Sequence, residues 1–283
     1  MTTMMVLVYG TILISVLFTE QVYAANLMAT KSRLFNELLI AHNREISPQN
    51  SFDEPVKVKM SLVLSRIIEL DRTNMLTIET YKRYTWEDYR FAWNPEDFGG
   101  LTTIHLPVVD IWTPERDLRL YYGSEYSIDQ SASSGYASVR NNGLISMLTR
   151  PASRTTAQCV SDDADRTVRN CSFVYGLWSY GSNEVEFSAA EKPVDTRLFA
   201  GNINFELLSS TAERKQVTHP DDPSIINDEL AFTVNLKSND IASYKYEYAT
   251  GSANSHFLHE RLTHPCTTVV LILMGLIANI LIS

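Results

Sequence analysis

Alternation of apolar and polar side chains is the clearest pattern along this chain. Apolar residues alternate with mostly polar neighbours at Val56, Val58, Met60, Leu62 and Leu64. The same alternation returns late in the chain at Leu230, Phe232, Val234 and Leu236. A period of two is typical of a β-strand that buries one face, so both segments are predicted to be strands.

Shorter apolar stretches lie between these two strands, at residues 80–93, 104–111, 144–148, 172–178, 185–187 and 203–208. Clusters of Asn, Asp, Gly and Pro separate them, as in the turn signal at residues 94–100. Before the first strand, residues 28–46 carry Leu34, Leu38, Leu39 and Ile46, and part of that spacing suits an amphipathic helix. Many short strands after one helix predict an all-β sandwich or barrel with an N-terminal α-helix.

The first 24 residues contain an apolar run, Val6 to Phe18, and end on Val22-Tyr23-Ala24. A short apolar segment followed by small residues is typical of a signal peptide, and we expect cleavage after Ala24. The alternative is a membrane anchor, but about a dozen apolar residues are too few to span a bilayer comfortably.

A second apolar run, residues 267–283, follows small residues at 251–255 and a polar spacer that ends near residue 266. This order is typical of a GPI-attachment signal, with Ser252 or a close neighbour as the lipidation site. The alternative is a single membrane helix of marginal length. We therefore expect a globular domain over residues 25–248, a spacer over 249–266 and a tail over 267–283.

Cysteine usage agrees with an exported protein. Cys159 and Cys171 are expected to pair in an oxidising compartment, which would stabilise the fold by about 3 kcal/mol. Cys266 would leave with the tail. Asn170 begins the sequon Asn-Cys-Ser and is a predicted glycosylation site. The excess of 33 acidic over 24 basic residues argues against nucleic acid as a partner.

Several motifs resemble a known family. Trp86-Glu87-Asp88-Tyr89 is followed by Trp93-Asn94-Pro95-Glu96-Asp97-Phe98-Gly99-Gly100, and then by Ile111-Trp112-Thr113-Pro114. The stretch from Cys159 to Cys171 then leads into Gly176-Leu177-Trp178-Ser179-Tyr180. In this order the motifs resemble the extracellular ligand-binding domain of nicotinic-type Cys-loop receptors and the secreted acetylcholine-binding proteins.

This resemblance implies an immunoglobulin-like β-sandwich that assembles as a homo- or hetero-pentamer, with ligand sites between subunits. Receptors also have four membrane helices after the last strand and an apolar tip in the loop between the two cysteines. Here five of the nine residues at 161–169 are charged, and a charged tip is not stably buried against apolar helices. We therefore expect an extracellular binding protein without a pore, attached to the membrane only through the tail or a GPI anchor.

The resemblance also implies a ligand site built from two faces of neighbouring subunits. On the principal face it places Trp178, Tyr121 (if Glu115-Arg116 is an inserted pair), and His219, Asp221 and Asp222 in the third loop. On the complementary face it places Tyr81, Ser146 and Leu148. Aromatic rings bind cationic amines through their negative faces, so a small amine is the expected ligand.

The third loop departs from the family pattern. Asp221-Asp222 replaces a pair of vicinal cysteines, and His219 and Ile226 stand where the family has tyrosines. Carboxylates can still attract an ammonium group, but the same change also suits a structural or adhesive surface protein with no small-molecule ligand. A truncated receptor subunit that modulates full-length channels is a further alternative. By contrast, Trp86, Trp93 and Trp112 are expected in the core.

Enzyme chemistry has no support in the sequence. It contains no recognisable set of nucleophile, base and orienting residue. It also contains no histidine pair with metal-ligand spacing and no Gly-rich phosphate loop, so neither a metal nor a cofactor is expected.

Overall fold

The computed structural model of the chain describes residues 26–40, 42–128, 135–150, 152–219 and 222–239. The predicted signal peptide, Asp221, Ser252 and the C-terminal tail lie outside these residues. Among the residues that are described, no helix is long and apolar enough to cross a membrane.

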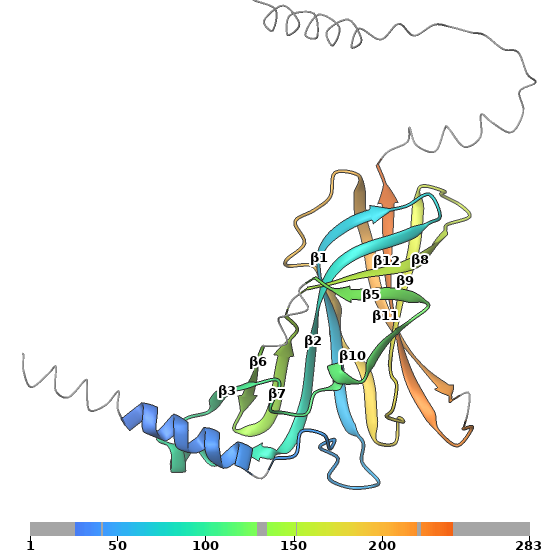
Figure 1. Cartoon of the computed structure of the whole chain (residues 1–283). Coiled ribbons are helices and arrows are strands. Elements are labelled where there is room, and N and C mark those ends of the chain that lie inside the picture. Colours follow the sequence, from blue (N-terminus) through green and yellow to red (C-terminus); the bar gives the residue numbers. More distant parts are fainter. Residues whose placement is uncertain (1–25, 41, 129–134, 151, 220–221, 240–283) are drawn as a thin grey trace, which may run out of the picture. The chain divides into compact units, whose positions relative to one another are not determined.

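Residues 26–40 form the predicted helix, which lies beside the edge of the domain where β3 is found (Figure 1). Leu34 and Leu38 are buried, as the periodicity indicated. Ile46 is 58% exposed, so its assignment to the same apolar face is wrong. The chain turns at Asn43, whose side chain accepts a hydrogen bond from the Glu45 N–H at 2.9 Å. Asn favours such local turns over helix continuation, and the helix therefore ends before Ile46.

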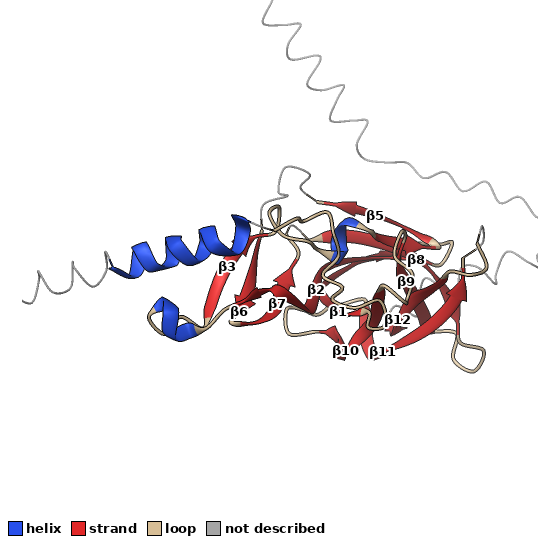
Figure 2. Cartoon of the chain, turned by 90° about the horizontal axis from the view of Figure 1, so that it is seen from below, coloured by secondary structure: helices blue, strands red, loops and turns tan. Residues whose placement is uncertain are grey.

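Twelve strands and two 3-10 helices follow among the described residues (Figure 2). They are β1 (Val56–Leu70), β2 (Met75–Ala92), η1 (Pro95–Phe98), β3 (Thr103–Pro107), η2 (Pro114–Arg116), β4 (Leu118–Tyr121), β5 (Gly123–Ser127), β6 (Tyr136–Arg140), β7 (Asn142–Leu148), β8 (Ser153–Ser161), β9 (Val168–Leu177), β10 (Val185–Asp195), β11 (Phe205–Thr218) and β12 (Ile226–Ser238). The fold is the predicted β-sandwich.

The strands pair in the order β11-β12-β9-β8-β2-β7-β6-β3. β8 joins the two sheets, because residues 153–158 pair with β2 while Cys159–Ser161 pair with β9. β1 lies between β2 and β10, and its pairing with β10 is parallel. The sheet that contains β1, β2, β3, β5, β6, β7 and β10 packs against the sheet that contains β4, β9, β11 and β12, and buried residues of both sheets form one core.

The two alternating strands differ in how far the pattern holds. In β12 all four predicted core positions are at most 1% exposed. In β1 the alternation holds only at the start, because every residue from Met60 to Leu64 is buried. β1 pairs along both edges, with β2 and β10, and the segment after β10 continues beside it, where Ala200 N–H donates to Ser65 O and the Asn202 side chain donates to Ile67 O. The expectation of a single buried face along residues 56–64 is therefore wrong for the second half of that segment.

β11 is much longer than the apolar stretch at 203–208 indicated. It is an edge strand in the pairing order, and most of its residues are exposed. An edge strand with little buried surface needs few apolar residues, so its length leaves no hydrophobic pattern. β8 gave no strand signal for a different reason: it is a central strand with alternate residues buried, but Ser153 and Thr155 are polar, so no hydrophobic period appears.

The predicted disulfide is present between Cys159 and Cys171, which face each other on β8 and β9. The loop that it closes packs on the β1–β2 turn, where Cys159 N–H donates to Asn74 O at 2.8 Å. Arg169 donates to the Asn74 side chain at 3.1 Å and is 4% exposed. The side chains of Asp162 and Asp165 cap turns inside the loop. Much of its polar character is thus used within the domain.

The predicted core tryptophans are buried, with Trp86, Trp93 and Trp112 at 1%, 9% and 2% exposure. The rings of Trp86 and Trp112 meet edge to face at 6.0 Å between centroids. At the predicted turn, Gly99 and Gly100 adopt positive φ angles of 62° and 84°, which favours glycine at both positions.

A buried ion cluster lies between the sheets. Lys82 of β2 is 4% exposed, and its Nζ lies 3.0 Å from Glu115 Oε1 and 2.7 Å from Glu125 Oε1. The hydroxyl of Tyr84 also donates to Glu115. Burial by itself lowers the pKa of Lys82, but the two carboxylates outweigh burial and raise this pKa above its ordinary value. The cluster ties η2 and β5 to β2.

Replacing Lys82 by Ala is expected to lower the free energy of unfolding by about 3–5 kcal/mol, because Glu115 and Glu125 would lose their buried cation. Urea unfolding at pH 7 measures this loss. Lys57→Ala removes an exposed lysine from β1 and is the matched control, expected to cost less than about 0.5 kcal/mol. The triple variant Lys82→Met, Glu115→Gln, Glu125→Gln should recover part of the loss. Equal effects of Lys82→Ala and Lys57→Ala would contradict the role of the cluster.

Candidate functional site

Trp178 stands at the end of β9 and is 59% exposed, unlike the three core tryptophans. The backbone N–H of Trp178 donates to the backbone oxygen of Asp117 at 3.0 Å. The Asp117 carboxylate accepts from the N–H groups of Ser179 at 2.7 Å and Tyr180 at 3.3 Å. Asp117 thus fixes the backbone on both sides of the Trp178 side chain and leaves the indole ring at the surface.

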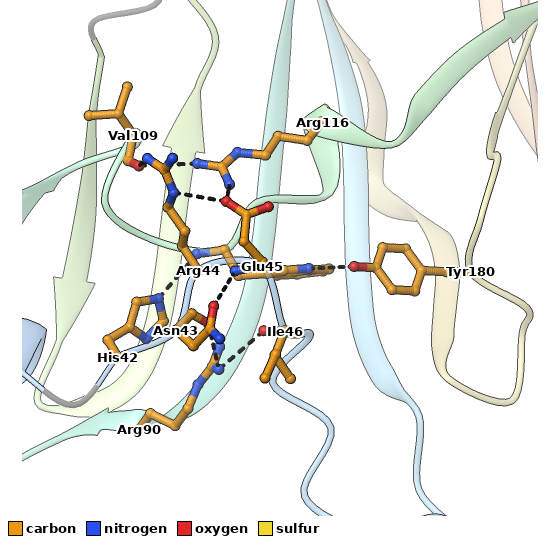
Figure 3. A network of polar contacts seen from close by, with 10 residues as sticks. His42, Asn43, Arg44, Glu45, Ile46, Arg90, Val109, Arg116 and Tyr180 are labelled. Carbon is orange, nitrogen blue, oxygen red and sulfur yellow. Dashed lines mark hydrogen bonds and ion pairs between the residues drawn. The ribbon is translucent and has the colours of Figure 1, made fainter.

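A second chain of contacts reaches the same loop from the N-terminal helix. The Trp112 indole N–H donates to the Tyr180 hydroxyl at 3.1 Å, and the Trp112 backbone N–H donates to Nε2 of His42 at 3.3 Å. Figure 3 shows His42 and Tyr180 at opposite ends of this arrangement. Contact with the Phe91 ring, at 4.5 Å between centroids, holds the imidazole in place. The loop that carries Trp178 is therefore linked to the residue just beyond the helix.

Tyr121 lies on the same outer face as Trp178. β4 pairs with β9, and the Tyr121 ring covers Gly176 so closely that a Cβ at Gly176 would lie 2.6 Å from Tyr121 Cε2. Gly176 is two residues before Trp178, which directly follows the end of β9, so the Tyr121 ring lies beside the strand end that leads into Trp178. Burial and then the charge of Glu229 raise the pKa of Tyr121, so its hydroxyl stays protonated at neutral pH.

The described residues at the tip of the β11–β12 hairpin are His219 and residues 222–225, which include the predicted third-loop residues His219 and Asp222. The N–H of His219 donates to Ile225 O at 2.9 Å. Asp222 accepts from the Ser224 N–H and hydroxyl at 2.9 and 2.7 Å, and these bonds lower the pKa of its exposed carboxyl. Ser182 N–H donates to Ile226 O at 2.7 Å, which joins the base of the tip to the segment after Trp178. Asp221 lies outside the described residues.

Tyr81, Ser146 and Leu148, the predicted complementary residues, share one outer face of the other sheet. In β2, Lys82, Tyr84 and Trp86 point into the core, so Tyr81, Arg83 and Thr85 point outward. In the β2–β7 ladder Arg83 is opposite Leu148, and Thr85 is opposite Ser146. Directly opposed residues lie on the same side of a sheet.

The two groups belong to the outer faces of different sheets. One chain therefore does not bring Trp178 and Tyr121 together with Tyr81, Ser146 and Leu148. A site that contains both groups needs a second copy of the domain or a related subunit.

Several residues around these faces were not predicted from the sequence. Arg83 could have been found, because the β2 alternation places it beside Tyr81. Asp117 has no sequence signal of its own, since its role depends on contacts with residues more than sixty positions away. Glu115 and Arg116, which the resemblance treats as an inserted pair, each form an ion pair. Glu115 pairs with Lys82, and Arg116 pairs with Glu45 at 3.2 Å (Figure 3).

An open hollow of about 800 Å³ lies beside the end of the helix. Its lining is Leu39, His42, Asn43, Arg44, Glu45 and Asp110. The predicted ligand residues do not line it, so it is separate from both faces described above. Within the described part of the chain, no group of three or more His, Cys, Asp or Glu side chains is arranged to hold a metal ion.

Comparison with known proteins gives a consistent picture. A family model described as the neurotransmitter-gated ion-channel ligand binding domain matches residues 31–239. The neuronal acetylcholine receptor subunit non-alpha-2 of Carassius auratus is 33% identical over 207 residues, which cover 71% of this chain and 43% of that protein. The subunit eat-2 of Caenorhabditis elegans is 28% identical over 235 residues, covering 80% and 47%.

The subunit alpha-5 of Homo sapiens is 26% identical over 184 residues, which cover 64% of this chain and 38% of that protein. The chain spans less than half of the length of these relatives.

The link through His42 predicts a pH dependence. Burial and then Arg90 lower the pKa of His42, against a smaller opposing effect of Asp88. Because Nε2 accepts the Trp112 N–H, the neutral ring suits the fold. As the pH falls below about 6.5, the unfolded chain binds the proton first. The contribution of His42 to the free energy of unfolding should therefore be fully present above that pH. It should decrease as the pH falls further, until the pH reaches the lowered pKa of His42 in the folded protein.

Urea unfolding at pH 7 and pH 5 measures this effect, with His42→Gln as the comparison. Gln keeps an acceptor for Trp112 but does not titrate, so the variant should lose less stability on acidification. Equal losses in both proteins would contradict a role for His42.

Proposed function

Because this chain belongs to the neurotransmitter-gated ion-channel ligand-binding domain family, we propose that it is an extracellular binding domain that assembles as a ring of five. The ring binds a small cationic ligand between neighbouring subunits and forms no pore. Several relatives are named as acetylcholine receptor subunits, which supports a ligand with an ammonium group.

The observation that carries the proposal is the division of surface aromatic residues between two outer faces. Trp178 and Tyr121 lie on one face, and Tyr81 lies on the other. Trp178 is far more exposed than the core tryptophans, so its indole surface is available to a neighbour or a ligand. Two such faces in contact would enclose a cation between aromatic rings.

The polar loop between Cys159 and Cys171 supports the absence of a pore. Its Arg169 and its capping aspartates bond within the domain and to the β1–β2 turn. An apolar membrane partner would have to desolvate these charges, which is unfavourable. The loop thus suits a domain that does not couple to membrane helices.

A structural or adhesive surface protein is the second candidate. It is favoured by the hairpin tip, where Asp222 and Ser224 form a polar turn and where His219 and Ile226 stand in place of aromatic residues. In this case the ring would be retained, and the interface would hold no small molecule.

A mixing experiment distinguishes the two candidates. In calorimetric titration of the purified full chain with acetylcholine, nicotine and serotonin, we expect at least one ligand to bind. Trp178→Ala and Tyr81→Ala should each weaken binding about tenfold or more, because each removes a ring from the cation. Phe52→Ala, which truncates a 98% exposed side chain, is the control and should bind normally.

In a co-expressed mixture, the Trp178→Ala subunit keeps an intact Tyr81 face and the Tyr81→Ala subunit keeps an intact Trp178 face. Random assembly joins these two intact faces at roughly a quarter of the interfaces, where normal affinity should return. Native mass spectrometry of the same sample reports the number of subunits. Absence of binding in the unmodified protein would favour the structural candidate, and failure to restore sites on mixing would contradict an interface site.

We also propose that residues 1–24 are a cleaved signal peptide, that Asn170 is glycosylated, and that the C-terminal segment is exchanged for a GPI anchor near Ser252. On cells that express the full chain, a phospholipase specific for phosphatidylinositol should release the protein into the medium. Retention on the cells after treatment, with a known anchored protein released in parallel, would indicate a membrane helix instead.

A further inference from the structure

Tyr122 has a backbone conformation that its residue type disfavours. Its φ angle is 58°, in the left-handed region, where the Cβ of an L-residue lies too close to the following carbonyl oxygen. Among the described residues, the other non-glycine residue with a positive φ is Asn74, at 60°. Asparagine adopts this region readily, whereas a bulky side chain there is strained. Tyr122 is therefore the strained residue of the described chain.

The strain comes from the path of the chain between the two sheets. Tyr122 joins β4, which pairs with β9 in one sheet, to β5, which pairs with the part of β8 in the other sheet. The next residue, Gly123, lies so close to β8 that a Cβ there would be 2.4 Å from Thr156 O. This crossing leaves no room to relax the φ angle of Tyr122. The backbone alone would therefore favour glycine or asparagine at this position.

Packing inside the domain does not offset the strain. Tyr122 is 80% exposed, whereas Tyr84 and Tyr175 are fully buried in the core. Its phenol ring contacts the ring of Tyr121, with 6.4 Å between centroids and 54° between planes. Stabilisation by burial is roughly proportional to the apolar area removed from water. A side chain as exposed as Tyr122 therefore adds little to the stability of its own subunit.

The position of Tyr122 indicates what could use its side chain. Tyr121 lies beside the end of β9 that leads into Trp178, and Tyr122 extends this aromatic surface to the point where the chain crosses between the sheets. Tyrosine is enriched at protein–protein interfaces, because its ring buries a large area and its hydroxyl can stay hydrated. Strained residues are found mainly where the strain serves a function. The proposed assembly brings a neighbouring copy against this region.

We propose that Tyr122 is a subunit-contact residue, whose phenol ring packs on the neighbouring copy of this chain beside the ligand site. This inference rests on the assembly proposed above. The contact between subunits offsets a strain that nothing inside the single subunit offsets. Tyr122 thus destabilises the isolated subunit and stabilises the assembly, and these opposite effects distinguish it from an ordinary surface tyrosine.

Tyr122→Asn separates the two effects, because asparagine accepts the φ angle and lacks the ring. In sedimentation of the purified full chain over a dilution series, the variant assembly should dissociate at a concentration at least tenfold higher than the unmodified assembly. Thermal unfolding is then compared in sub-denaturing urea, where both proteins sediment as single subunits. There the unfolding midpoint of Tyr122→Asn should be about 2–4 °C higher, because the strain is relieved.

Two control variants separate the ring from the backbone. Tyr122→Phe keeps both the aromatic ring and the strain, so it should match the unmodified protein in both measurements. Phe52→Asn removes a 98% exposed ring from a residue outside the left-handed region, so it should change neither.

The outcomes distinguish this inference from the proposed assembly. If the unmodified chain sediments as a single subunit at every concentration, the assembly is wrong and the inference falls with it. If the assembly forms and Tyr122→Asn dissociates like the unmodified protein, the inference is wrong while the assembly stands. A lower unfolding midpoint in Tyr122→Asn would also overturn the inference, because the side chain would then stabilise its own subunit. Weaker ligand binding in an assembly of unchanged stability would overturn it too, in favour of a ligand contact.

Discussion

The ammonium group of Lys82 sets the main constraint on this domain, because it is buried between the sheets and needs a counter-charge there. Glu115 and Glu125 supply it only if η2 and β5 lie against β2. Glu115 is two residues before Asp117, which holds the backbone around Trp178. The same ion cluster that stabilises the core therefore positions the loop on which the proposed site depends.

The site itself is divided by the sandwich architecture. Side chains that alternate outward from the two sheets face away from each other, so Trp178 and Tyr81 of one chain do not share a pocket. Assembly is thus a condition of binding in the proposed function.

The sequence predicted the elements with strong one-sided burial. The β12 pattern and the three core tryptophans were found because each buries an apolar side chain, and burial is what periodicity reports. β11 and β8 were missed or shortened because an edge strand and a polar strand bury little apolar surface. Ile46 was misplaced because a local Asn43 turn ended the helix.

The sequence by itself determined the family, the disulfide between Cys159 and Cys171, and Trp178 as the candidate site residue, because motifs and cysteines are properties of the chain order. Only the tertiary structure decided which charges meet. Arg83 and Asp195 are 112 positions apart, and Lys82 and Glu115 are 33 apart. Such pairs depend on strand register and sheet packing, which no local pattern encodes. The pairing of Arg83 with Asp195 could therefore be recognised only in the folded domain.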